Sequence, residues 1–104
     1  MTLDPPLRVA LEEAFDSFIR EPKKYEKGFS TLLRMVGIEP NLDSILSFIS
    51  GCMYGCMIAY YRNSYRRSPT KEEYRAFNEW IKRRAWELRQ AFIGTRIEEP
   101  SEDE

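Results

Sequence analysis

The sequence predicts an all-α protein, a compact four-helix bundle with a buried apolar third helix. Apolar side chains recur every three or four residues over most of the chain, which is the period of an amphipathic helix. Prolines, glycines and capping residues divide this pattern into four segments. No segment alternates polar and apolar residues over the length of a strand, so we expect no β-sheet.

Length and composition limit the organisation. The chain has 104 residues, of which 42% are hydrophobic and 32% charged. This length fits one domain, and this composition excludes wholesale disorder. We expect a single helical domain over residues 1–96 and an acidic, disordered tail over residues 97–104.

The first helix is expected from Pro5 to Arg20, with Asp4 as its N-cap and prolines in its first turn. Its apolar face comprises Leu7, Leu11, Ala14, Phe15, Phe18 and Ile19. Glu12 and Asp16 then lie on the solvated side. The dipeptide Glu21-Pro22 ends the helix, because a residue before proline avoids the α conformation.

The second helix is expected from Lys23 to Val36, and Gly37 is a suitable residue to end it. Its apolar side comprises Tyr25, Phe29, Leu32, Leu33 and Val36. The fourth helix begins at Thr70, which forms a capping box with Glu73, and it ends at Gly94. Its predicted core face comprises Tyr74, Phe77, Ile81, Ala85, Leu88 and Phe92.

The third helix, from Leu42 to Tyr65 with Asn41 as N-cap, is apolar or small on nearly all sides. One broad face carries Leu42, Ile45, Leu46, Ile49, Cys52, Met53, Cys56, Met57 and Tyr60. Such a helix is either buried or spans a membrane. Asp43 and the serines lower its hydropathy, and the flanking helices are amphipathic, so we expect the core of a bundle and no membrane.

A second stripe on this helix consists of small residues spaced by four: Ser47, Gly51, Gly55 and Ala59. Such a stripe lets another helix backbone approach closely. The neighbour is either the second or fourth helix of the same chain or the central helix of a second copy. The sequence does not choose between these two neighbours. Because the second one is another copy of the chain, we expect a homodimer. In a filled groove, Gly55→Leu is expected to overpack and destabilise the fold.

The sequence gives little support for a metal site or a reactive thiol. Cys52 and Cys56 lie four residues apart in the apolar run, and the chain has no histidine. A structural zinc site needs four ligands, so we expect no metal and no cofactor. Buried free thiols are expected instead, which favours a reducing compartment. The N-terminus also lacks the pattern of a secretory signal, so the expected location is cytoplasmic.

Catalytic motifs are not apparent. Glu12, Glu13 and Asp16 form a carboxylate cluster of the kind that holds magnesium in helical nucleotide hydrolases. No inward-facing carboxylates are expected on a second helix, and there is no glycine-rich phosphate loop. We therefore expect no enzymatic activity, with a magnesium-dependent nucleotide hydrolase as the less favoured alternative.

The charge distribution gives the clearest functional signal. The whole chain has a formal net charge of −1, but residues 60–96 carry ten Lys or Arg and four Glu, a net charge of +6. The leading hypothesis is a small protein-interaction module, or a subunit of a larger assembly, whose partner-binding face lies on the fourth helix. That face comprises Arg75, Lys82, Trp86, Arg89 and Ile93. An exposed tryptophan with cations around it is typical of an interface.

The alternative is a nucleic-acid-binding helical protein that uses the basic 60–96 segment. Its contacts would come from Arg62, Arg66, Arg67 and Lys71, which lie among tyrosines. Arginine and aromatic side chains suit phosphate contacts and base stacking. The near-zero net charge and the acidic tail oppose this alternative, because sequence-independent affinity comes mostly from neutralised phosphates.

Overall fold

The computed structural model describes residues 2–95. They form four helices, α1 (Pro5–Arg20), α2 (Pro22–Met35), α3 (Leu42–Tyr65) and α4 (Lys71–Ile93), and this part of the chain contains no strand. The predicted all-α four-helix fold is confirmed. The acidic tail predicted over 97–104 lies outside the described residues.

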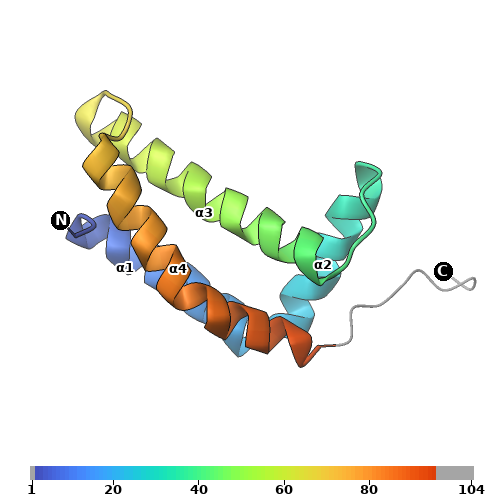
Figure 1. Ribbon diagram of the computed structural model, residues 1–104. Coiled ribbons are helices and arrows are strands. Elements are labelled where there is room, and N and C mark those ends of the chain that lie inside the picture. Colours follow the sequence, from blue (N-terminus) through green and yellow to red (C-terminus); the bar gives the residue numbers. More distant parts are fainter. Residues whose placement is uncertain (1, 96–104) are drawn as a thin grey trace, which may run out of the picture.

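The helices are all in mutual contact. α1 and α4 lie side by side, α3 runs across from them, and α2 meets the N-terminal end of α3 (Figure 1). The largest fully buried side chains come from all four helices: Leu11, Phe15, Ser30, Ile45, Ile49, Met57, Tyr61 and Phe92. All of them except Ser30 belong to one hydrophobic core.

Most helix ends have the predicted capping interactions. Asn41 accepts a 2.9 Å hydrogen bond from the amide of Ser44, and Thr70 accepts one of 3.2 Å from Glu73. Both capping boxes are complete. Gly37 has a φ of 80°, which suits its predicted place after α2. Gly94 differs: its φ of −66° is right-handed, so α4 ends without a left-handed glycine.

Asp4 does not cap α1 with its side chain as predicted. Its carboxylate instead accepts hydrogen bonds from the hydroxyl of Tyr65, at 2.6 Å, and from that of Tyr60, at 3.3 Å. These tyrosines belong to the last turns of α3, so a tertiary contact has taken the place of the local one. Pro5 and Pro6 occupy the first turn of α1 as expected.

α3 supplies the central stripe of the core, but only along one side. Its buried residues recur at every fourth position: Ile45, Ile49, Met53, Met57 and Tyr61. The prediction that Cys52 and Cys56 are buried is wrong, because both are exposed. α1 and α4 lie on one side of α3, and α2 stands at its N-terminal end (Figure 1). The outer side of α3 is therefore uncovered within residues 2–95.

The contact between α1 and α4 also differs from the prediction. Trp80 is buried, with 2% of its surface exposed, and its ring packs edge-on against Phe15. The indole nitrogen of Trp80 donates to the Glu12 carboxylate, so Glu12 faces α4 and is not on the solvated side. Ala85, predicted to be in the core, is exposed.

A candidate interaction surface between α3 and α4

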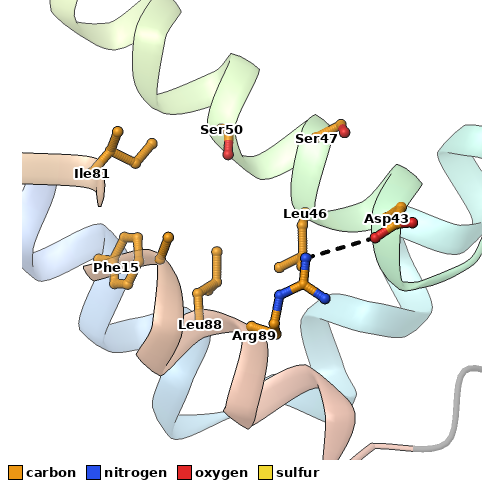
Figure 2. A pocket seen from close by; sticks show the side chains of 9 residues that line it. Phe15, Asp43, Leu46, Ser47, Ser50, Ile81, Leu88 and Arg89 are labelled. Carbon is orange, nitrogen blue, oxygen red and sulfur yellow. Dashed lines mark ion pairs between the residues drawn. The ribbon is translucent and has the colours of Figure 1, made fainter. Parts of the chain in front are cut away.

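An open groove separates the N-terminal part of α3 from the C-terminal half of α4. It has a volume of about 550 Å³, and Figure 2 shows its walls. Asp43, Leu46, Ser47 and Ser50 line the α3 side, Ile81, Ala85, Leu88 and Arg89 line the α4 side, and Phe15 of α1 lines it as well. The lining is therefore largely apolar, with one acid and one base.

The groove exists because small side chains face each other where two helices would otherwise interlock. Ser47 and Ser50 on α3 and Ala85 on α4 are too short to fill the space between the backbones. Nearer the C-terminal end of α3 and the N-terminal end of α4, Tyr54 stacks on Tyr74 with ring centroids 5.8 Å apart. At the other end, the Arg89 guanidinium lies 3.8 Å from the Asp43 carboxylate (Figure 2).

One of the predicted partner-binding residues, Arg89, lines this groove. Arg75, Lys82, Trp86, Arg89 and Ile93 are all exposed. Arg89 lines the groove, and Trp86, with 68% of its surface exposed, is three residues before it on α4. Residues three apart on a helix are surface neighbours, so Trp86 adjoins the α4 rim of the groove.

The sequence missed the floor and the α3 wall of this surface. Ile81 and Leu88 have the spacing of core residues. Nothing in the sequence shows that α3 is separated from them by a groove. The sequence places Ser47 in the small-residue stripe. The hydrophobic pattern does not report the distance between two helices, so no local signal could have revealed the groove.

Arg84 of α4 binds the carboxylate cluster of α1. Arg84 donates to Glu12 and, at 2.9 Å, to Asp16, while its guanidinium lies 4.7 Å from the centre of the Phe15 ring. Arg84 also pairs with Glu87 at 2.9 Å. Within residues 2–95 no group of three or more Asp, Glu, Cys or His side chains could hold a metal ion. Two of the three carboxylates thus already neutralise an arginine.

The four residues predicted to bind nucleic acid differ in their contacts within the fold. Arg67 donates to both carboxylate oxygens of Glu73, at 2.6 and 3.1 Å, and lies over the rings of Tyr61 and Tyr65. The hydrogen bond from Arg67 holds the pKa of Glu73 down at about 2, despite an opposing effect of burial. Arg62, Arg66 and Lys71 are exposed.

The stripe of small residues on α3 is exposed, and its first member, Ser47, also lines the groove toward α4. Ser47, Gly51, Gly55 and Ala59 are all exposed, and Cβ atoms placed on the two glycines would meet nothing within 4 Å. Neither α2 nor α4 therefore fills the stripe, and the expected overpacking by Gly55→Leu has no neighbour to act on within residues 2–95. Partial desolvation, then the nearby Cys56, raises the pKa of Cys52, so the thiol stays protonated near neutral pH.

α3 is long and apolar enough to cross a membrane, by length and composition alone. Its mean hydropathy reaches 1.5 over an 18-residue window, of which 22% is buried. A core helix can pass the same test, so this is weak support for a membrane span. Comparison with protein-family models, with curated proteins and with solved structures finds no match for the chain.

Proposed function

We propose that this protein is a small, non-catalytic interaction module of the cytoplasm that binds a partner protein through the α3–α4 groove and the adjoining face of α4. The observation that carries the proposal is the position of Trp86. A tryptophan with 68% of its surface exposed stands beside an apolar groove, next to Arg89. Aromatic and arginine side chains beside an apolar pocket are the usual anchors of a protein interface.

The chemistry of this surface favours an amphipathic helix as the bound element. The groove runs between two helices, and its lining includes Phe15, Ile81 and Leu88. An apolar stripe on a third helix can pack into such a groove at intervals of three and four residues. Trp86 and Ile93 would extend the apolar contact beyond the groove itself.

The charges on this face of α4 indicate acidic flanks on that helix. Arg75, Lys82 and Arg89 are exposed on the same face of α4. Arg89 has Asp43 at 3.8 Å, but the Asp43 side chain is 86% exposed, so the pair is loose and solvated. Complementary charges at the rim would mainly raise the association rate and fix the orientation of the partner.

The proposal is tested by capture of partners from the cell of origin on the immobilised protein. Trp86→Ala and Arg89→Glu are expected to reduce capture of the same proteins at least tenfold, with unchanged melting temperatures. Val9→Ala is the matched control, because Val9 is also an exposed apolar residue, at 57%, but lies on α1. Equal loss with all three variants, or no loss with any, would argue against the assigned surface.

Nucleic-acid binding is the second candidate, and the observation in its favour is the exposure of Arg62, Arg66 and Lys71. It is weaker because Arg67 is held by Glu73 and because the tyrosines nearby contact Asp4. If it holds, affinity for a mixed-sequence oligonucleotide falls by orders of magnitude between about 50 and 200 mM salt. Absence of binding at 50 mM salt eliminates it.

A further inference from the structure

A second, smaller pocket lies between the start of α1 and residues 76–83 of α4, the two helices that run side by side in Figure 1. Its volume is about 200 Å³. Part of its wall is apolar and includes the buried ring of Trp80. Three exposed, charged side chains line it as well: Arg8 of α1, and Glu79 and Arg83 of α4.

These charged side chains share the pocket without pairing. Within residues 2–95, the guanidinium groups of Arg8 and Arg83 and the carboxylate of Glu79 form no hydrogen bond or ion pair. Glu79 and Arg83 are four residues apart on α4, a spacing at which such pairs often form. The next residue, Arg84, is by contrast held by Glu12 of α1. Two cations and one anion therefore line a common space that they do not close by direct contact.

The polar groups of the pocket define the chemistry of a ligand. Two guanidinium groups present planar sets of N–H donors that suit an anion with several oxygens, and the Thr2 hydroxyl adds another donor. With Glu79, the three charged side chains have a net charge of +1. An ionised carboxylate only accepts hydrogen bonds, so an anion beside Glu79 needs a hydroxyl of its own.

Hydrogen phosphate meets both requirements, because it has several acceptor oxygens and keeps a hydroxyl at neutral pH. Sulfate has the oxygens alone. The size of the pocket agrees, since its volume of about 200 Å³ is several times the roughly 30 Å³ that one water molecule occupies in the liquid. A small oxyanion therefore has room to lie between the helices.

We propose that this pocket binds inorganic phosphate in a protonated form. Arg8 and Arg83 donate to the phosphate oxygens, and the phosphate hydroxyl donates to the carboxylate of Glu79. The site is separate from the α3–α4 groove, because Arg83 and Ala85, which lines the groove, are about 200° apart around α4. Phosphate and the partner protein proposed above therefore bind on opposite sides of this helix.

Two-dimensional NMR of the isotope-labelled full chain, titrated with sodium phosphate at pH 7.5 and constant ionic strength, tests the proposal. The amide signals of residues 76–83 are expected to shift. Arg8→Gln and Arg83→Gln are each expected to raise the phosphate dissociation constant about tenfold, since each removes hydrogen bonds to a charged ligand. The fold tolerates both, because neither guanidinium has a partner within residues 2–95.

Lys82→Gln is the matched control. It removes the same charge from the neighbouring position of α4, which is exposed but does not line the pocket. It is expected to leave the phosphate dissociation constant nearly unchanged. A loss equal to that of Arg83→Gln would show that only the general charge of α4 attracts phosphate, and would contradict a defined site.

The role of Glu79 has its own test. Without a hydroxyl to donate, sulfate is expected to bind at least about tenfold more weakly than phosphate. Glu79→Gln is expected to bring the two dissociation constants together, because the amide can donate to either anion. A phosphate monoester has a second pKa of about 6, so β-glycerophosphate has mostly lost its proton at pH 7.5 and is expected to bind as weakly as sulfate.

Three outcomes would overturn the proposal. One is the absence of any shift over residues 76–83 at tens of millimolar phosphate. Another is phosphate binding that Arg8→Gln and Arg83→Gln leave as tight as before. The third is sulfate or β-glycerophosphate binding as tight as that of phosphate, because the pocket would then not recognise the hydroxyl. None of them affects the partner capture at Trp86, so the two proposals fail separately.

Discussion

The hydroxyl of Tyr65 donates a 2.6 Å hydrogen bond to the carboxylate of Asp4, which joins the start of α1 to the last turn of α3. This hydrogen bond, together with the charge of Asp4, raises the pKa of Tyr65 to about 12. The contact therefore stabilises the fold fully below pH 10, the ordinary phenol pKa, and is lost as the pH rises from 10 toward 12.

The first prediction follows from this contact. Tyr65→Phe is expected to lower the melting temperature at pH 8, because Asp4 loses its closest donor. The difference between Tyr65→Phe and the unaltered protein is expected to shrink as the pH rises from 10 toward 12. Thermal unfolding followed by circular dichroism over this range checks it. A difference that stays constant with pH would show that the contact does not hold.

The second prediction concerns acid stability. Because the pKa of Glu73 is lowered to about 2, its contacts with Arg67 and the Thr70 amide stabilise the fold above about pH 4.5. This stabilisation is lost as the pH falls from 4.5 toward 2. Glu73→Gln is expected to be less stable at pH 7 and to approach the unaltered protein near pH 2. Glu72→Gln, at an exposed neighbouring site, is the control.

The third prediction compares two glycines. Gly28 lies within α2, and a Cβ placed there would meet nothing within 4 Å, so Gly28→Ala is expected to raise the free energy of unfolding by up to about 1 kcal/mol. Gly37 has a φ of 80°, so Gly37→Ala is expected to lower it by about 1 kcal/mol. Urea titrations measure both. The same sign for the two changes would contradict the helical conformation of Gly28 and the left-handed conformation of Gly37.

The fourth prediction compares the two tryptophans. Trp80→Ala removes a buried ring and the hydrogen bond to Glu12, and is expected to cost about 3–5 kcal/mol. Trp86→Ala removes an exposed ring and is expected to change stability by less than about 0.5 kcal/mol. Chemical denaturation distinguishes them. A large loss with Trp86→Ala would mean that Trp86 belongs to the fold and is not free for a partner.

Local chemistry allowed much of the fold to be predicted. The caps Asn41 and Thr70 and the turn at Gly37 depend on one residue type meeting nearby backbone, which the sequence shows directly. The pairing of Trp80 with Glu12 joins residues far apart in the chain, so helical spacing alone placed Glu12 in solvent.

The exposure of α3 could not be predicted for a related reason. The apolar residues of α3 extend around the helix, and the sequence gives no measure of how much of it three neighbours cover. Ile45 and Ile49 are buried while Cys52 and Cys56 are exposed, although all four belonged to one predicted face. The candidate site was predicted in part: its cations and Trp86 follow from composition, but its groove depends on the separation of α3 and α4.

Site-specific photocrosslinking in the living cell shows whether a protein partner binds the α3–α4 surface. A photoreactive residue is placed at Ala85 or Trp86, and at Val9 on α1 as a control. A partner bound at this surface is expected to give discrete protein adducts at positions 85 and 86 that Arg89→Glu abolishes, with none of the same adducts at position 9. Adducts at position 9 alone, or adducts at 85 and 86 that a nuclease removes, would contradict it.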